Sequence, residues 1–438
     1  MSKQINAGPP LLVVLLVLLG LCAGTLATRS HAQTAGTGTA QNAAIISTTD
    51  AVLKETSELR ELPILRPVKS GAQSRSEIER MIIKNLDTDT TPAEMHATEV
   101  LLRVFGLAPK NFAYKPFLIK LLTEQVAGYY DPKAQQFYLA DWIELEGQKP
   151  VMAHELTHAL QDQHFNLKRF EKWPKGDSDA ELAAHALIEG DATLAMTVYL
   201  KKHPLVALAF IRSVQGQQIS SEQFKRAPRV LRESLMFPYQ QGSAWAEQVY
   251  ERGGWELISK AYSKLPQSTE QILHAEKYFA YEAPVKVTIP DLKQVLGPKW
   301  KLLDTDVNGE WGYYLILDEY INNTGESKRA AAGWGGDQFV LYESVGSPDA
   351  FIAQFTSWDT AADAREFFAA YLKRTWKRYP DAKATETIST TERGERHEWK
   401  TESGRSVLEL RDSRVVILEG IPAKVNTTAL LNRIWHQG

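Results

Sequence analysis

Cysteine is almost absent from this chain of 438 residues. The single one is Cys22, so no internal disulfide is possible. Because Cys22 lies in a segment with the features of a removable signal, we expect the remaining chain to be stabilised by core packing. Neither positively nor negatively charged residues are in large excess. The formal net charge of −3 and the pI near 6.4 give no electrostatic support for nucleic acid as a partner.

Long apolar runs are scarce as well. The uninterrupted run at residues 11–19 is shorter than the about 20 residues that span a membrane. It follows Lys3, and the Ser-His-Ala at residues 30–32 places small residues at the two positions that decide cleavage before Gln33. Residues 1–32 are therefore predicted to be a signal peptide, and the protein to be exported, either secreted or in the periplasm or cell envelope. No transmembrane domain is expected in the mature chain unless this segment is retained as an anchor.

The composition of the remaining chain predicts a linker and two domains. Residues 33–54 are expected to be a flexible linker, because this stretch is rich in Ala, Thr, Gly and Gln. The chain beyond the linker is long enough for two domains of roughly 100–200 residues each. We expect a catalytic domain at residues 55–283 and a second domain at residues 284–438.

The expected fold class is α+β. The first domain has mostly helical patterns, but two β-prone runs around a turn at residues 125–140 predict a small hairpin. An exposed edge of that hairpin could hold an extended peptide by main-chain hydrogen bonds, although an ordinary sheet element explains the sequence equally well. In the second domain, strands are predicted at residues 339–343, 351–358, 407–411 and 415–419. With a helix at 360–379, this pattern predicts an antiparallel α+β domain.

The strongest functional signal is an H-E-x-x-H pattern formed by His154, Glu155 and His158. On a helix, positions four residues apart share one face. The two histidines can therefore offer imidazole nitrogens to a single metal ion, and Glu155 lies where it could take a proton from a metal-bound water. Because unpaired polar groups are costly in such an apolar helix, a metal site is favoured over a chance match.

A third ligand is predicted on a helix expected at residues 178–202. Glu189 lies there in an apolar stretch, and Gly190 costs about 1 kcal/mol relative to Ala inside a helix. Both features are explained if this helix packs closely on the His154 helix and Glu189 binds the metal. The alternative is that Glu189 lies on a solvated face. Asp191 is expected to orient a ligand histidine.

His164 is the competing third ligand. It follows His154 with the spacing of the metzincins, H-E-x-x-H-x-x-G-x-x-H, and Met236 lies in a segment that resembles their methionine turn. Gln161, however, stands where the metzincin glycine breaks the helix. On a continuous helix, His164 points away from the histidine pair and lies about 15 Å along the axis from His154. Glu189 is therefore preferred, and a metzincin-like protease is the alternative.

Hydrolysis at a metal centre also needs a group that stabilises the oxyanion of the tetrahedral intermediate. Tyr239 and His274 are the candidates downstream of the ligands. A structural role, as a core tyrosine and as a hydrogen-bonded histidine, explains each of them equally well.

The H-E-x-x-H pattern followed by Glu189 in an E-G-D-A context resembles the gluzincin-type zinc metallopeptidases. Longer strings at residues 123–132, 154–165 and 268–278 are similar to a poorly characterised family of predicted secreted bacterial metallopeptidases. The resemblance covers roughly residues 55–282. It departs from thermolysin-like enzymes because Glu189 follows His158 by 31 positions (189 − 158), and because Thr193 replaces the aspartate of their E-x-x-x-D pattern.

The resemblance implies a Zn²⁺ cofactor with His154, His158 and Glu189 as ligands and Glu155 as the general base. The predicted function is that of an exported zinc peptidase acting on a peptide or protein substrate. The rival is a non-catalytic zinc-binding protein of the cell envelope. Because a structural zinc site normally has four protein ligands, the three found here favour a catalytic site.

Overall fold

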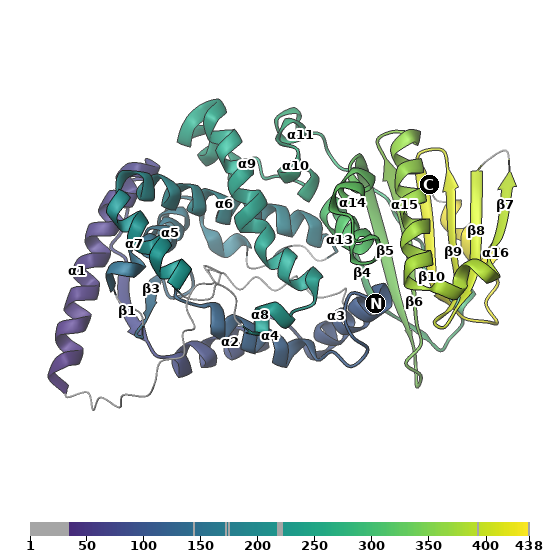
Figure 1. Ribbon diagram of the computed structural model, residues 1–438, viewed down its shortest axis with the longest axis horizontal. Helices are drawn as coiled ribbons and strands as arrows, with labels where there is room; N and C mark the ends of the chain where they lie inside the picture. Colours follow the sequence, from purple (N-terminus) through teal and green to yellow (C-terminus); the bar gives the residue numbers. More distant parts are fainter. Residues whose placement is uncertain are drawn as a thin grey trace, which may run out of the picture.

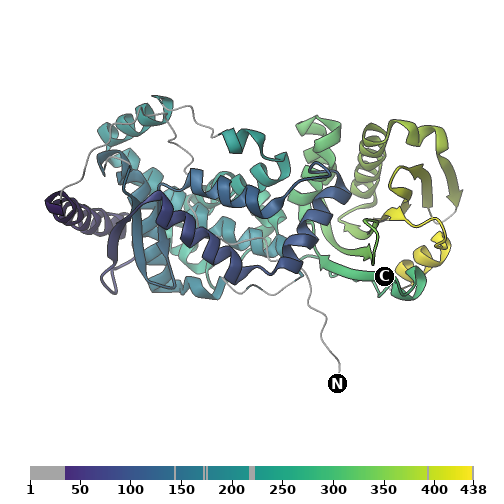
Figure 2. The same cartoon turned by 90° about the horizontal axis from the view of Figure 1, so that it is seen from below.

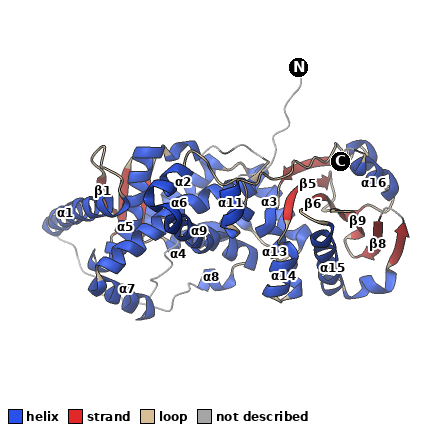
Figure 3. Cartoon of the chain, turned by 90° about the horizontal axis from the view of Figure 1, so that it is seen from above, coloured by secondary structure: helices blue, strands red, loops and turns tan. Residues whose placement is uncertain are grey.

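The computed structural model describes residues 35–142, 145–170, 173, 176–216, 222–391 and 394–436. The molecule is elongated, with a helical half that begins at α1 and a half built on a large sheet (Figure 1). Figure 3 shows the strands gathered in two places, a small sheet near α1 and the large sheet near the C-terminus. The predicted α+β class is confirmed. The expected signal peptide lies outside the described residues.

The helical half contains most of the helices. They are α1 (Ala35–Arg60), α2 (Arg75–Asp89), α3 (Pro92–Phe105), α4 (Tyr114–Gln125), α5 (Leu145–Phe165), α6 (Ser178–Lys202), α7 (Pro204–Gly216), α8 (Glu222–Arg226), α9 (Arg229–Ala261), α10 (Thr269–Leu273) and α11 (Ala275–Ala280), with a 3₁₀ turn, η1 (Leu167–Phe170). Capping boxes at Ser74 and Thr91 start α2 and α3, because each hydroxyl and the glutamate three residues later satisfy helical N–H groups that have no partner inside the helix.

Helix α1 occupies most of the flexible linker that the composition predicts at residues 33–54, so that prediction is wrong. Among its described side chains, Ile45, Val52 and Leu53 are buried and belong to the same cluster as apolar residues of α5. Their spacing places them on one helical face. The many small and polar residues around them hide this face when only the average composition is considered.

A small sheet packs beside α5. Strands β2 (Gly128–Asp131) and β3 (Gln136–Ala140) form the antiparallel hairpin predicted within residues 125–140. Strand β1 (Lys69–Gln73) pairs with β3 in parallel, an addition that the sequence did not suggest. The strand order β1-β3-β2 leaves β2 at an edge, and β2 contacts α5.

The C-terminal half is built on an antiparallel sheet with strand order β4-β5-β6-β10-β9-β8-β7. Its strands are β4 (Trp300–Asp306), β5 (Trp334–Ser344), β6 (Ala350–Trp358), β7 (Thr387–Thr391), β8 (Gly394–Thr401), β9 (Gly404–Arg411) and β10 (Arg414–Ile421). Its helices are α12 (Lys293–Leu296), α13 (Gly309–Ile321), α14 (Thr324–Ala331), α15 (Ala361–Arg378) and α16 (Thr427–Trp435), with a 3₁₀ turn, η2 (Pro380–Thr385). The predicted strands and the predicted helix at 360–379 are all present.

Both faces of the large sheet are covered. Val415 and Ile417 of β10 face the core that contains Phe367 of α15, whereas Val416 and Leu418 face the cluster that contains α12 and α16. Because successive side chains of a strand point to opposite faces, this continuous apolar run is what a strand buried on both sides requires.

The two halves share one hydrophobic core. Phe105 of α3, Trp311 of α13 and Phe339 of β5 belong to a single cluster, and the rings of Phe105 and Phe339 meet edge to face with centroids 6.4 Å apart. Figure 2 shows the dark blue helices of the first half reaching the C-terminal half. The predicted domain boundary at 283/284 falls in the connection between α11 and α12, but the core continues across it.

Within the described residues, no single helix is long and apolar enough to cross a membrane. The bent pair formed by α6 and residues 204–211 of α7 meets the criteria of length and composition, with an angle of 113° between the two helices.

Buried carboxyl groups gather where α6 begins against the C-terminal half. The backbone N–H of Ser178 donates to Asp306 Oδ1 at 2.8 Å, and the backbone N–H of Thr269 donates to Asp179 Oδ2 at 3.0 Å. Glu181 is only 3% exposed, so its carboxyl group is almost completely removed from solvent. Burial, with the charge of Asp306, raises the pKa of Glu181 to about 8.

We expect Glu181→Gln to stabilise the protein at pH 8 and to leave it nearly unchanged at pH 4. An acid whose pKa rises on folding costs no stability below its unfolded pKa of about 4.5, and stability is lost as the pH rises from there to about 8. The cost at pH 8 reaches up to about 4 kcal/mol. Thermal unfolding across this pH range measures it, with Glu247→Gln on an exposed position of α9 as the control. Equal melting temperatures of the variant and the wild type at pH 8 would contradict the prediction.

Candidate metal centre

Helix α5 presents the two histidines of the H-E-x-x-H pattern. His154 and His158 are both 0% exposed, and their rings meet at 84° with centroids 4.8 Å apart. The helix forms here because Met152, Ala153 and Leu156 bury an apolar face against the small sheet and α1. The opposite face is thereby directed at α6, which packs along α5.

Glu189 of α6 completes a group of three possible metal ligands. Its Oε2 lies 3.1 Å from His154 Nε2 and 3.4 Å from His158 Nε2, and the two Nε2 atoms are 3.1 Å apart. Tetrahedral ligands at zinc distances of about 2.0–2.1 Å are separated by about 3.3 Å. The three atoms therefore already lie at the separations that a shared metal ion imposes. Within the part of the chain that the structure describes, no other such group is found.

Glycine is required at position 190 for a different reason from the one that the sequence suggested. A Cβ at Gly190 would lie 2.2 Å from the carbonyl oxygen of Gly242 on α9, and a Cβ at Gly242 would lie 2.3 Å from the carbonyl oxygen of Ala186. The close approach that requires glycine is thus between α6 and α9, not between α6 and the His154 helix. This contact fixes α6, and with it Glu189, against the core.

Asp191 reaches a ligand histidine through Gln161. His158 donates from Nδ1 to Gln161 Oε1 at 2.8 Å, and Gln161 donates from Nε2 to Asp191 Oδ2 at 2.9 Å. Arg60 of α1 and Tyr262 also donate to Asp191. Because Nδ1 of His158 donates to Gln161, Nε2 is the nitrogen that faces the ligand group. Asp191 therefore contacts His158 only through Gln161, and its orienting role stays a prediction.

Glu155 is buried next to the ligand group. Its Oε2 accepts a hydrogen bond of 2.8 Å from the backbone N–H of Tyr130 on the edge strand β2. Its Oε1 is buried and has no hydrogen-bond partner among the described residues. Burial raises the pKa of Glu155 to about 8. One oxygen of this buried carboxyl group is therefore held by the backbone, and the other has no partner among the described residues.

The charges of the three ligands depend on one another. Burial alone would raise the pKa of Glu189, but the charge of His158 and hydrogen bonds from both histidines hold that pKa well below 4.5. Burial also lowers the pKa of His154. It lowers that of His158 too, but Glu189 outweighs burial and raises the pKa of His158 to about 9. A divalent cation bound here would displace the proton from His158 and take over the pairing with Glu189.

Tyr239 lies at the site, as predicted. Its ring stacks on that of His154, with centroids 6.1 Å apart and an interplanar angle of 29°. It comes from α9, the helix that the paired glycines hold against α6. Tyr239 therefore remains a candidate for stabilising an oxyanion.

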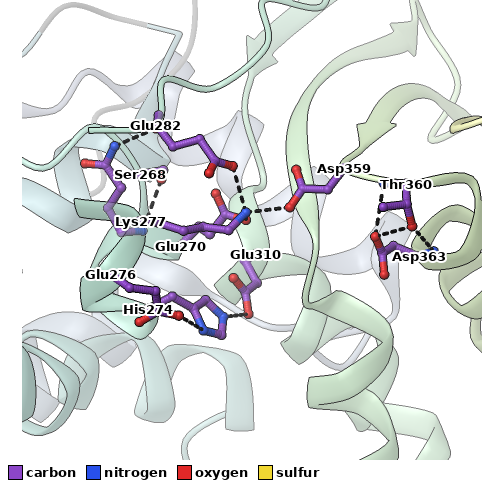
Figure 4. A network of polar contacts seen from close by, with 11 residues as sticks. Ser268, Glu270, His274, Glu276, Lys277, Glu282, Glu310, Asp359, Thr360 and Asp363 are labelled. Atoms are coloured by element: carbon purple, nitrogen blue, oxygen red, sulfur yellow. Dashed lines mark hydrogen bonds and ion pairs between the residues drawn. The ribbon is translucent and has the colours of Figure 1, made fainter. Parts of the chain in front are cut away.

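His274 belongs to a different network, so its predicted role in the site is not supported. Its Nε2 lies 3.0 Å from Glu310 Oε1 on α13, and the neighbouring Lys277 pairs with Glu270, Glu282 and Asp359 (Figure 4). Hydrogen bonding to Glu310 raises the pKa of His274. These contacts join α10 and α11 to the C-terminal half, which is the structural role that the sequence left open.

His164 also lies apart from the ligand group. Helix α5 continues unbroken through Phe165, and His164 donates from Nε2 to the carbonyl oxygen of Pro63 at 2.7 Å. Gln161, in the place of the metzincin glycine, is instead the hydrogen-bond partner of His158. The metzincin-like alternative therefore has no geometric support.

His185 is a site residue that the sequence analysis missed. It precedes Glu189 by one helical turn on α6, its Nε2 is buried, and this atom has no hydrogen-bond partner among the described residues. Burial lowers the pKa of His185 to about 4, so the imidazole is neutral near pH 7. The sequence could have identified His185 by its position four residues before Glu189, because such residues are neighbours on a helix surface.

Residues 300–430 match a family described as a domain of unknown function, DUF8575. The match covers most of the large sheet and its helices, and it begins well after the ligands on α5 and α6. No curated protein and no solved structure matches the chain.

Proposed function

We propose that this protein is a zinc-dependent peptidase. The observation that supports the proposal is the convergence of His154 Nε2, His158 Nε2 and Glu189 Oε2 within 4.8 Å of one another. Two neutral imidazoles and one carboxylate form a ligand set typical of catalytic zinc. The buried Glu155, with its unpaired Oε1, supplies a proton acceptor beside them.

When bound, zinc lowers the pKa of a water molecule to about 7 and polarises the scissile carbonyl. Glu155 accepts the proton of the attacking water and later delivers it to the leaving amine. The hydrogen bond from Tyr130 holds one oxygen of Glu155 and leaves the other for this exchange. The pKa of Glu155, which burial raises to about 8, would fall towards neutrality beside a bound cation, and a general base is most effective there.

Metal content and hydrolysis of an unstructured protein test the proposal together. We expect about one zinc ion for each chain, cleavage of casein, loss of cleavage with a chelator and recovery when zinc is returned. Stoichiometric zinc without hydrolysis of any tested substrate would instead favour the non-catalytic zinc-binding protein of the cell envelope. Absence of bound zinc would count against both.

We also propose that the protein is exported, on the basis of residues 1–32. If so, the mature N-terminus is expected at Gln33, directly after the small residues at positions 30–32. N-terminal sequencing of the exported protein checks this. An intact Met1 would indicate a retained anchor, and a start beyond α1 would indicate removal of a longer segment.

A further inference from the structure

A cavity of about 250 Å³ begins at the candidate metal centre and extends to the C-terminal half. Glu189 and Tyr239 line its wall, so the cavity is continuous with the site. Helices α3, α4, α6 and α9 form its sides, and Trp311, Leu315 and Ile316 of α13 form the side contributed by the C-terminal half. A concave space next to a catalytic centre is the usual place for a substrate group.

Most of the side chains around the cavity are apolar. Leu118 and Leu122 of α4 face it from one side, and Leu235 of α9 from another. Together with the side chains of α13, they form a part of the wall where a polar ligand would lose its hydration without replacement. An apolar group loses nothing by entering and gains from leaving water.

The wall also carries carboxyl groups besides the ligand Glu189. They belong to Asp179 and Glu181 of α6 and to Asp304 and Asp306 of β4. Glu181, His185 and Glu189 line the cavity from successive turns of α6, so Glu181 lies about 12 Å along the helix from the metal ligand. Burial raises the pKa of Asp179, that of Glu181 to about 8 and that of Asp306 to about 7, so these carboxyl groups are charged less near pH 7 than exposed acids are.

We propose that the cavity receives a bulky apolar side chain of the peptide substrate, and that the C-terminal half is thereby part of the active site. This inference rests on the proposed peptidase function. It assigns a use to helix α13, which lies within the region that matches the family of unknown function. The helix closes the cavity and limits the size of the side chain that fits.

Gly312 of α13 offers a way to fill the cavity without touching the metal ligands. It lines the cavity, and a Cβ built there would meet only Asn308 Cβ, at 3.3 Å. Because glycine is unfavourable inside a helix, Gly312→Leu should also improve the helix propensity of α13. Gly325→Leu on α14 is the matched control, since Gly325 is exposed and does not line the cavity.

The test measures binding of N-acetylated amino-acid hydroxamates, which chelate zinc and carry one side chain each, to the zinc-loaded protein by calorimetry. For the wild type, the leucine compound should bind about 10–100-fold more tightly than the glycine compound. The norleucine compound should also bind more tightly than the lysine compound, which has the same four-carbon stem. In Gly312→Leu the preference for leucine should fall to within about threefold, while zinc content and thermal stability are kept. In Gly325→Leu the preference should persist.

The possible failures are distinguishable. Equal binding of the leucine and glycine compounds by the wild type would overturn the proposal that the cavity receives an apolar side chain. It would leave the metal centre in place. A preference for lysine over norleucine would show that the cavity recognises a cation through Glu181, and would overturn the proposal as well. If no hydroxamate binds, the metal centre itself fails, and the inference fails with the proposed function.

Discussion

Glu155→Gln is expected to remove nearly all peptide hydrolysis while the protein keeps its zinc and its fold. Glutamine has almost the same shape, and its carbonyl oxygen can still accept the hydrogen bond from Tyr130. It cannot accept the proton of the attacking water. General-base catalysis contributes about 10²–10⁴-fold to the rate, so turnover should fall by at least that factor.

Metal analysis and kcat/KM for a peptide substrate measure this change, and thermal unfolding checks the fold. Thr157→Val is the matched control, because Thr157 is buried in the same turn of α5 and its hydroxyl only donates to the carbonyl oxygen of Ala153. The control should keep both zinc and activity. Loss of zinc in Glu155→Gln would show that this residue is a ligand, and undiminished turnover would place the base elsewhere.

Local patterns predicted much of the fold. The capping boxes at Ser74 and Thr91 set the starts of α2 and α3, because they depend only on residues three positions apart. The continuous apolar run of β10 indicated a strand, because a strand that is buried on both faces carries apolar side chains at successive positions. The parallel pairing of β1 with β3 was not predictable, because it joins residues more than 60 positions apart without a distinctive local pattern.

The candidate site was likewise predictable from the sequence only in part. His154 and His158 follow from helical spacing, and Glu189 from the cost of an acid inside an apolar helix. The partner of Gly190 could not be known, because Gly242 meets it only through the crossing of α6 and α9. The contact of His274 with Glu310 could not be predicted for a related reason, since Glu310 lies on α13 in the other half.

Gln161 has contacts in the structure that its place in the sequence did not indicate. In the sequence, it shows only that the helix-breaking glycine of the metzincins is missing. In the structure its amide links His158 to Asp191, with its oxygen accepting from one and its nitrogen donating to the other. An amide can serve both partners because it carries an acceptor and a donor. This link connects Asp191 to His158, a residue that it does not touch.

Glu189→Ala is expected to lower zinc affinity by orders of magnitude. The substitution leaves two histidines and removes the anionic ligand, so the loss should exceed the about 10–100-fold that removal of an outer hydrogen-bond partner costs. Zinc content after dialysis against a weak chelator measures it. Because Glu189 is 4% exposed and pairs with both histidines, the fold of the variant is checked by circular dichroism and thermal unfolding.

His164→Ala provides the opposite control on the neighbouring helix. His164 lies at the end of α5 and donates to Pro63, so its removal should leave zinc affinity unchanged and cost at most about 1 kcal/mol of stability. If His164 were the third ligand, the two outcomes would be exchanged, and α5 would have to break near Gln161. Such a break would also separate Gln161 from His158 and Asp191, which the buried hydrogen bonds oppose. Full zinc in Glu189→Ala with loss of zinc in His164→Ala would therefore overturn both the ligand assignment and the helix on which it rests.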